Sequence, residues 1–342
     1  MFKKIDLKEL RKDKNISNRF LNAEFKELDI KCNIYKDNFF IDSFNYYLIS
    51  EDYKVFEDLF SRDVHINYTN FFTKNFYENF NKKVDNFKNF SGVYLLGSNA
   101  ANNYYSNLIQ FLPRIFFNNN KKIRLGIHRN SSIKFRNFIE KILNSVGTDY
   151  TFVYLDDDFY SFTESEFPQF FNINNSIKIL KKFLQPREEN KLDKKIYITR
   201  ENASYRKIVN EADIIPILRS KGYKVINPEL YEINEQIKIF AEADKIISPH
   251  GSNLSNIIFC KPGTEIYELG PQFDNNFEVI LKNRYKVLAD YNNLKYKRMT
   301  CDIVPIENHS DTAKKYINNK ILFNSNYYKN LVIKLSDIRN ID

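Results

Sequence analysis

The sequence predicts an α/β fold with two domains. In two stretches, residues 92–156 and 195–270, short apolar strand patterns alternate with helical patterns, which is typical of parallel βαβ units. A charged, proline-containing segment at 184–195 separates them and has the composition of a linker. A chain of 342 residues is long enough for two such domains. We therefore predict an N-terminal domain at 1–190 and a C-terminal domain at 191–342, with ligands bound in a cleft between them.

The N-terminal elements become clear only after residue 90. Before it, aromatic-rich runs such as residues 38–49 indicate short strands in an α+β region. Between Asp157 and Lys195 the pattern loosens, and the run DDDFYSFTESEF at 156–167 is acidic and polar, so no strand is predicted there. The remaining pattern predicts strands at 92–97, 122–127 and 151–156, and helices at 105–117 and 132–147, the latter closed by Gly147.

The C-terminal elements follow a regular alternation that predicts a doubly wound parallel sheet. Asn210 is expected to cap the helix that ends at Gly222, and Pro216 predicts a kink or a late start of that helix. Strands are predicted at 195–200, 223–228, 245–250 and 264–270, and further helices at 234–244 and 252–260.

Composition narrows the class of protein. With 43% hydrophobic and 16% aromatic residues the chain can bury a sizeable core. The net charge of +9 would suit a polyanionic partner, but the basic residues are scattered among acidic ones. The abundance of Lys, Asn, Ile, Phe and Tyr also fits an AT-rich coding bias. The basic segment 118–130 carries no nucleic-acid-binding motif, so no nucleic-acid partner is predicted.

The cysteines and apolar runs indicate a reducing compartment and no membrane span. Cys32, Cys260 and Cys301 are odd in number and form no CxxC pair. The N-terminus lacks the apolar run of a signal peptide, and no stretch approaches the ~20 apolar residues that cross a bilayer. We expect a cytoplasmic protein whose basic and aromatic surface residues would allow peripheral docking at the inner membrane.

The strongest local signal is the turn Ser248-Pro249-His250-Gly251, which joins a strand to a helix. Ligands of open α/β sheets bind at the carboxyl ends of the strands, and the start of a helix presents unpaired N–H groups. This combination suits a diphosphate, and His250 could donate to a phosphate or a sugar hydroxyl. The alternative is a purely structural turn that Pro249 and Gly251 shape and His250 caps.

Arginines mark the end of a neighbouring strand. Arg200 ends the strand at 195–200, and Arg206 follows in the loop. Two guanidinium groups there could clamp a diphosphate bidentately. The alternative is a surface pair of Arg206 with Glu211. Asn210 and Glu211 are most simply interpreted as an N-cap and a dipole-compensating first turn.

Carboxylates at strand ends are further candidates. The run from Asp156 to Asp158 could supply a base or a metal ligand, but such runs are more often solvated loops, and we predict no metal site. Glu268, near the end of a strand, could hold the ribose hydroxyls of a nucleotide, or it could serve the turn before Gly270.

Taken in order, these motifs resemble glycosyltransferase family 61. The family pattern is a strand ending in Arg, then A-x-x-R-x-x-x-N-E, P-E, E-Q-x-x-x-F-x-x-A, P-H-G, a Leu-x-N helix, P-G and E-L. The resemblance runs without a gap from residue 197 to residue 270. The corresponding residues here are Arg200, Ala203, Arg206, Asn210, Glu211, Pro228, Glu229, Glu235, Gln236, Phe240, Ala243, Pro249, His250, Gly251, Leu254, Asn256, Pro262, Gly263, Glu268 and Leu269.

A weaker resemblance lies upstream, where residues 103–115 are similar to the family's N-Y-x-H-W-L-x-x-x-L-P-R segment through Asn103, Tyr105, Leu108, Leu112, Pro113 and Arg114. Ser106 replaces the usual His of that segment, and Ser252-Asn253 replaces the usual Ala-Gly after P-H-G. If the family His acts on the acceptor, this chain has lost it or uses another group.

The resemblance implies a GT-B architecture, in which two Rossmann-like domains face each other across a cleft. It implies an inverting transfer from a nucleotide sugar, most simply a UDP-sugar, to a glycan or lipid-linked acceptor in surface polysaccharide assembly, without a further cofactor. Glu211 and His250 are the catalytic candidates. Donor binding is expected from Arg200, Arg206, Asn210, Pro249, Gly251, Ser252, Asn253, Asn256 and Glu268, and acceptor contacts from Asn103, Tyr105, Ser106 and Arg114. The alternative is a catalytically idle relative that binds a nucleotide sugar or a protein partner.

Overall fold

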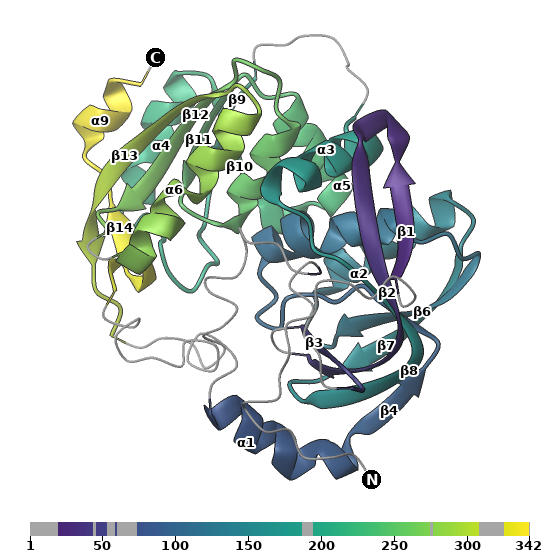
Figure 1. The fold of residues 1–342 in the computed structure, drawn as a ribbon. Helices are drawn as coiled ribbons and strands as arrows, with labels where there is room; N and C mark the ends of the chain where they lie inside the picture. The colour runs from purple at the N-terminus through teal and green to yellow at the C-terminus, as the bar shows by residue number, and fades with distance from the viewer. Residues whose placement is uncertain are drawn as a thin grey trace. The chain divides into compact units, whose positions relative to one another are not determined.

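The chain divides into two compact units, Met1–Lys182 and Phe183–Asp342, each with its own β-sheet (Figure 1). The computed structural model describes residues 20–43, 46–52, 59, 74–186, 194–273, 276–307 and 325–341. Most of the predicted linker and the N-terminal 19 residues lie outside the described part.

The N-terminal unit is built on a mixed sheet in the order β1-β2-β8-β5-β6-β7, with β3 beside β2 and β4 beside β8. The first three strands are antiparallel to their partners, whereas β4 and β5 run parallel to β8, and β5, β6 and β7 run parallel to one another. The strands are β1 Phe20–Phe25, β2 Ile30–Asp42, β3 Tyr47–Ser50, β4 Lys88–Ser91, β5 Val93–Leu95, β6 Lys122–His128, β7 Asp149–Leu155 and β8 Phe159–Pro168.

Helices α1 (Lys74–Lys83), α2 (Ile133–Ser145) and α3 (Ile173–Leu184) accompany this sheet. The prediction for α2 is confirmed: the Ser132 side chain accepts the amide hydrogen of Phe135, and Gly147 adopts a positive φ just beyond the helix. The predicted helix at 105–117 instead consists of a π-helical turn, Ser106–Phe111, followed by a 3₁₀ helix, Leu112–Phe117. Pro113 lacks the N–H that a regular α-helix would need there.

No strand was predicted in the acidic and polar run 156–167, but residues Phe159–Pro168 form β8, which lies inside the sheet between β2 and β5. Buried Tyr160, Phe162 and Phe167 face the core, while the acidic residues between them are more exposed. The Ser165 hydroxyl, also buried, accepts the amide hydrogen of Val93 at 3.0 Å. Apolar and polar residues alternate with the period of two that is typical of a strand, but the polar residues of this segment suggested an irregular region.

The C-terminal unit confirms the parallel sheet predicted for residues 195–270. Its order is β10-β9-β11-β12-β13-β14, in which only β14 is antiparallel to its neighbour. The strands are β9 Lys195–Ile198, β10 Tyr223–Ile226, β11 Lys245–Pro249, β12 Glu265–Pro271, β13 Lys295–Val304 and β14 Asn330–Val332. The helices are α4 Glu211–Ser220, α5 Ile233–Ala241, a 3₁₀ helix Ser252–Phe259, α6 Asn276–Tyr291 and α9 Leu335–Arg339.

Two local expectations about α4 need correction. Asn210 stands at the N-cap position, but its side chain does not cap the helix; it exchanges two hydrogen bonds with the backbone of Ile333. Pro216 lies inside a helix that already begins at Glu211, so it does not delay the start. Among the described helices, none combines the length and apolar character of a membrane-crossing segment.

Candidate functional site

The site lies where the strand order of the C-terminal sheet reverses. The chain passes from β9 to β10 in one direction and then returns to the other side of β9 with β11. Arg200 follows β9, and His250 and Gly251 follow β11, so they flank this switch point. In open α/β sheets, ligands bind at the carboxyl ends of the two strands that separate there.

A buried histidine–carboxylate pair joins the end of β11 to β12. His250 and Glu268 are both fully buried, and His250 Nδ1 lies 2.6 Å from Glu268 Oε1. The second carboxylate oxygen accepts the Tyr296 hydroxyl at 2.5 Å, and Arg298 Nε lies 3.6 Å from Oε1. Burial would raise the pKa of Glu268, but His250, Arg298 and Tyr296 outweigh it, and the pKa is lowered. Glu268 is therefore ionised.

His250 is neutral and has one unsatisfied nitrogen. Burial lowers the pKa of His250 to about 4, aided by Arg206 and Arg298 and opposed by Glu268. The imidazole proton lies on Nδ1, where Glu268 accepts it, so Nε2 presents a lone pair. This buried nitrogen has no hydrogen-bond partner among the described residues. Aromatic rings surround the imidazole, with centroids 5.0–5.7 Å away, at Phe273, Tyr285 and Tyr327.

Arg206 is fixed against the same turn. Its Nε donates to the carbonyl of His250 at 2.7 Å, and its Nη1 donates to the carbonyl of Tyr327 at 2.9 Å. The guanidinium carbon lies 3.9 Å from the ring centroid of Tyr327, a cation–π contact. Only 4% of Arg206 is exposed. The backbone carbonyls hold the charge in place without neutralising it.

Arg200 approaches the turn from β9. Its guanidinium lies against Gly251, where a Cβ would sit 2.8 Å from the guanidinium carbon. Gly251 is needed for this space and not for its backbone angle, since its φ of −175° is open to any residue. Nη2 donates to the Tyr205 carbonyl at 3.1 Å, while the buried Nε has no described partner. Burial lowers the pKa of Arg200 to about 10, with a contribution from Arg206.

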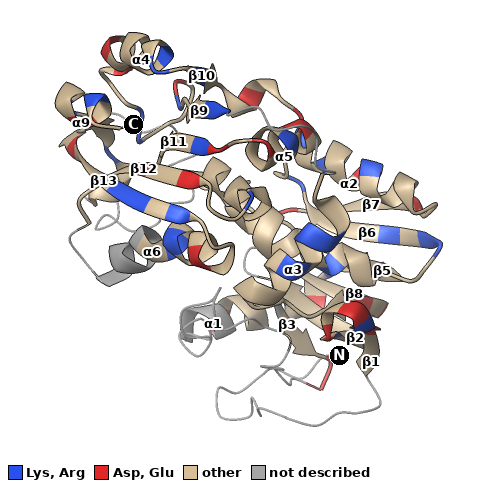
Figure 2. Cartoon of the chain, turned by 90° about the horizontal axis from the view of Figure 1, so that it is seen from above, with Lys and Arg blue, Asp and Glu red and all other residues tan. Residues whose placement is uncertain are grey.

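Arg298 and Tyr296 were missed by the sequence reasoning. Arg298 lies against Gly270 as Arg200 does against Gly251: an added Cβ would be 3.0 Å from its guanidinium carbon. It donates to the Pro271 carbonyl at 2.5 Å and lies over the ring of Phe273. Both residues come from β13, whose basic residues run beside the acidic positions of β12 (Figure 2). The alternation of charged and uncharged residues in KYKRMTCDIV could have predicted the strand β13 that carries them. The high charge of this segment argued against a buried strand.

The corner formed by Arg200, Arg206, Arg298, His250 and Glu268 carries excess positive charge. Glu268 is the one carboxylate in it, and Arg200 and Arg206 form no ion pair with a described carboxylate. The positive charge also affects Tyr327. Burial would raise the pKa of its phenol, but the charges of Arg206, Arg284 and Arg200 outweigh burial, and the pKa is lowered. We call this cluster the cationic corner. Such an arrangement can stabilise an anionic ligand.

The remaining predicted donor residues lie around the corner with different exposure. Ser252 and Asn253 are the first two residues of the 3₁₀ helix, so their backbone amides have no partner within that helix. Both residues are partly exposed. Pro249, Gly251 and Asn256 are buried. The Asn210 side chain is hydrogen-bonded to the backbone of Ile333 and not to the turn at His250 and Gly251.

Glu211 fastens α4 to β9. Its Oε1 accepts the Tyr197 hydroxyl at 2.6 Å, and its Oε2 accepts the Thr199 hydroxyl at 2.9 Å. Burial and Glu211 raise the pKa of Tyr197 well above its usual value, so the phenol keeps its proton. These bonds give Glu211 a structural function, and its catalytic role stays a prediction.

The predicted acceptor-side residues lie in the N-terminal unit. Asn103 accepts the amide hydrogen of Ser106 at 3.1 Å, which starts the π-helical turn, and Tyr105 is buried. Arg114 is fully buried, donates to the carbonyls of Leu96 and Pro168, and lies over Phe167 and Phe170. Arg114 therefore holds the unit together from inside, and its predicted contact with an acceptor stays a prediction.

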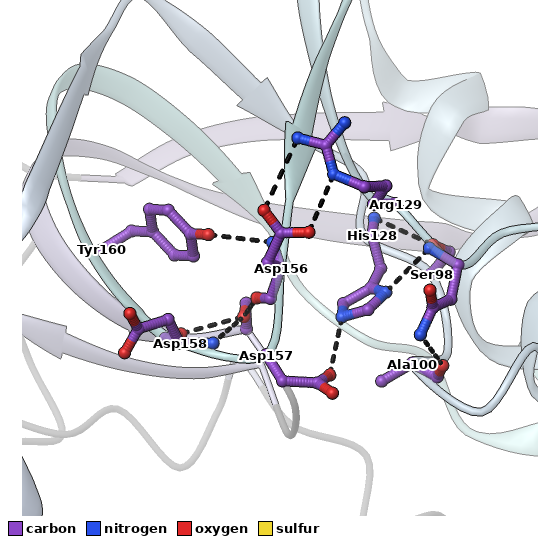
Figure 3. Close-up of polar contacts among 10 residues, drawn as sticks. Ser98, Ala100, His128, Arg129, Asp156, Asp157, Asp158 and Tyr160 are labelled. Carbon is purple, nitrogen blue, oxygen red and sulfur yellow. Dashed lines mark hydrogen bonds and ion pairs between the residues drawn. The ribbon is translucent and has the colours of Figure 1, made fainter. Parts of the chain in front are cut away.

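The acidic run from Asp156 to Asp158 is engaged in ion pairs and hydrogen bonds (Figure 3). Within the described ranges, no three His, Cys, Asp or Glu side chains gather in a way that could hold a metal ion. Asp156 instead pairs with Arg129, and Asp158 with Lys83.

A parallel sheet with a cationic corner at its switch point defines an α/β protein whose C-terminal unit is suited to an anionic ligand. Residues 55–267, more than half of the chain, match the family model described as glycosyltransferase 61. The chain therefore belongs to glycosyltransferase family 61, as the motifs predicted, and is a glycosyltransferase with a sugar donor and an acceptor. No curated protein matches it.

Proposed function

We propose that this chain is an inverting glycosyltransferase that transfers a sugar from a nucleotide sugar, a UDP-sugar in the simplest case, to a glycan or lipid-linked glycan. Family membership supports the transfer of a sugar. In this proposal the two units are the two domains of a GT-B enzyme, and the C-terminal unit binds the donor. Its strand order and switch point support that assignment.

The observation that carries the proposal is the uncompensated positive charge of the cationic corner. A departing nucleoside diphosphate accumulates negative charge as the bond to the sugar breaks, and fixed cations stabilise it. Arg200 and Arg206 converge on the turn at His250 and Gly251, and neither is paired with a described carboxylate. The proposal assigns the stabilisation of the leaving group to these guanidinium groups and the amides of Ser252 and Asn253, without a metal ion.

His250 supports this corner in the proposal. Its carbonyl holds Arg206, and its imidazole holds the ionised Glu268, which balances part of the charge of Arg298. A neutral imidazole with a free lone pair on Nε2 accepts hydrogen bonds, so a hydroxyl group of the donor is a better partner for it than a phosphate oxygen. This differs from the sequence-based expectation that His250 donates a hydrogen bond to a phosphate or to a sugar hydroxyl.

The cellular setting proposed is surface polysaccharide assembly in the cytoplasm, at the inner membrane where the acceptor is lipid-linked. The described cysteines, Cys32, Cys260 and Cys301, are buried and free, which supports a reducing compartment.

The proposal is tested by measuring whether UDP-sugars stabilise the protein and whether UDP is released. A donor bound at the corner raises the melting temperature by mass action. Arg200→Met keeps most of the side-chain volume but removes the charge, and should weaken donor binding roughly 10- to 100-fold, the equivalent of a lost charge-assisted hydrogen bond. The exposed Arg219, at the end of α4, provides the matched control Arg219→Met, which should bind as the wild type does.

Gly251→Ala is the second variant. Its Cβ would displace the Arg200 guanidinium without disturbing the backbone angle, so donor binding should fall as in Arg200→Met. Combining both substitutions should add little, because they remove the same interaction. Equal donor affinity in wild type and Arg200→Met would contradict the proposal. Donor binding without turnover on any acceptor would instead favour the catalytically idle relative.

A further inference from the structure

Three groups converge on the buried carboxylate of Glu268 in the cationic corner. His250 Nδ1 lies 2.6 Å from Oε1, Arg298 Nε lies 3.6 Å from the same oxygen, and the Tyr296 hydroxyl donates to Oε2 at 2.5 Å. Glu268 and Arg298 are partners in the parallel pairing of β12 with β13, so their side chains project from the same face of the sheet. The strand pairing therefore places a guanidinium beside the histidine–carboxylate pair.

Arg298 is held in this position by the end of β12. Its Nη2 donates to the Pro271 carbonyl at 2.5 Å, and its guanidinium carbon lies 4.5 Å from the centroid of the Phe273 ring. A Cβ on Gly270 would lie 2.3 Å from Nη2, so the guanidinium fills the space that the missing side chain leaves. Only 11% of the Arg298 side chain is exposed. Its positive charge is thus fixed beside Glu268.

The position of Arg298 determines what His250 can do. A buried carboxylate needs a positive charge nearby, and either Arg298 or a protonated His250 could provide it for Glu268. A protonated imidazole would have a donor on each ring nitrogen. Because Arg298 provides the charge, His250 stays neutral and its Nε2 keeps a lone pair. This buried nitrogen has no hydrogen-bond partner in the part of the chain that the structure describes.

Groups from three other elements also face His250. Arg206, in the loop before α4, donates to the His250 carbonyl, and its charge favours the neutral ring. Tyr285 of α6 and Tyr327 of the 3₁₀ turn before β14 have ring centroids 5.0 and 5.6 Å from that of the imidazole. Burial raises the pKa of Tyr285, whereas for Tyr327 the nearby arginines outweigh burial and lower the pKa. Tyr327 would favour a protonated imidazole only where its own phenol ionises.

We propose that Arg298 is a positioning residue which, through Glu268, holds His250 as the acceptor of a hydrogen bond from a hydroxyl group of the nucleotide sugar. This inference rests on the proposed function. It adds a residue of β13, which lies beyond the residues 55–267 that match the family. The hydroxyl belongs to the ribose or to the transferred sugar, since both are attached to the diphosphate. Without Arg298, the buried carboxylate would draw a proton onto Nε2, which would change from an acceptor to a donor.

The hydroxyl is identified with pairs of ligands that differ by one oxygen. Dissociation constants measured by calorimetry for UDP, 2′-deoxy-UDP and 3′-deoxy-UDP test the ribose, and those for UDP-glucose and its monodeoxy analogues test the sugar. One deoxy ligand should bind the wild type about tenfold more weakly than its parent, the equivalent of one hydrogen bond. This difference should disappear in His250→Asn, whose amide can donate to Glu268 but has no atom in the place of Nε2.

The role of Arg298 is tested by the pH dependence of that difference. In the wild type it should be constant between pH 8.5 and pH 5.5, because burial, aided by the arginines, lowers the pKa of His250 to about 4. Arg298→Met removes the charge, so the pH at which the difference is lost should rise by about one unit or more. Arg298→Lys keeps the charge and should restore the wild-type profile. The matched control is Lys297→Met, at the exposed neighbouring position of β13, which should behave as the wild type.

Gly270→Ala is the second variant, for the case that Arg298→Met does not fold. Its Cβ would displace the guanidinium while the arginine remains, and the pH profile should shift in the same direction. An unchanged profile in the variant that folds would overturn the inference, as would equal weakening of parent and deoxy ligands at every pH. Wild-type binding that no deoxy ligand weakens would also overturn it. Failure of the proposed function is distinct, since neither UDP nor a UDP-sugar would then bind the wild type.

Discussion

Among the described residues, each unit has a histidine–carboxylate pair at the ends of its parallel strands, and the two pairs differ in how deeply they are buried. In the C-terminal unit, His250 and Glu268 are both fully buried, and the imidazole keeps an unpartnered Nε2. In the N-terminal unit, both ring nitrogens of His128 are hydrogen-bonded, and the Asp157 carboxylate is the partly exposed member.

The difference shows that the same two residue types serve two purposes. At the cationic corner the carboxylate is a buried counter-charge for Arg298, and the imidazole helps to keep it ionised. In the N-terminal unit the imidazole is fixed by hydrogen bonds at both ring nitrogens, and the carboxylate can reach solvent. Breaking the fully buried pair is therefore expected to cost more stability than neutralising the partly exposed carboxylate.

The sharpest way to break this comparison is to neutralise the two carboxylates separately. Glu268→Gln removes a buried charge and leaves Arg298 and the Tyr296 hydroxyl without it, so the free energy of unfolding should fall by about 3–5 kcal/mol. Asp157→Asn keeps its hydrogen bond and should change it by less than about 1 kcal/mol. Urea unfolding followed by circular dichroism measures both.

Equal losses of stability in these two variants would remove the distinction between the pairs. Asp290→Asn is a suitable control for the loss of a negative charge as such, because Asp290 is exposed and pairs only with Lys286 on the surface of α6 among the described residues. It should be close to neutral.

The sequence predicted the backbone of the cationic corner but only part of its side chains. The apolar runs of β9, β11 and β12, and the glycine after His250, are local signals, so the parallel sheet and its switch point could be predicted. Arg298 and Tyr296 reach the corner through strand pairing with β12, and no local pattern encodes that pairing. His128 and Asp157 escaped notice as a pair for the same reason, since they meet through the parallel pairing of β6 and β7.

A second prediction is that the stability of the protein depends on pH because His250 is buried and neutral in the folded state. Its pKa is lowered from 6.5 to about 4, so the unfolded chain takes up a proton below pH 6.5 while the folded chain does not until about pH 4. Stability present above pH 6.5 is therefore lost as the pH falls, by about 2 kcal/mol between pH 6.5 and pH 5.

His250→Asn isolates this contribution from the other titrating groups. The asparagine amide can donate to Glu268 but does not titrate, so the variant should be less stable at pH 7.5 and should lose about 2 kcal/mol less than the wild type between pH 6.5 and pH 5. Urea midpoints at both pH values provide the measurement. Parallel pH profiles for the two proteins would show that His250 is protonated in the folded state.

The smallest expected effect concerns Glu211, whose hydrogen bonds indicate a structural role like that of Glu268 and whose catalytic role stays a prediction. Both of its oxygens accept hydroxyl hydrogen bonds from β9, so Tyr197→Phe should lower the free energy of unfolding by about 1–2 kcal/mol. Glu211→Gln should keep UDP release within about threefold of the wild type, because an amide oxygen can still accept one of these bonds. A loss of a hundredfold or more in kcat, with donor binding intact, would instead support the predicted catalytic role of Glu211.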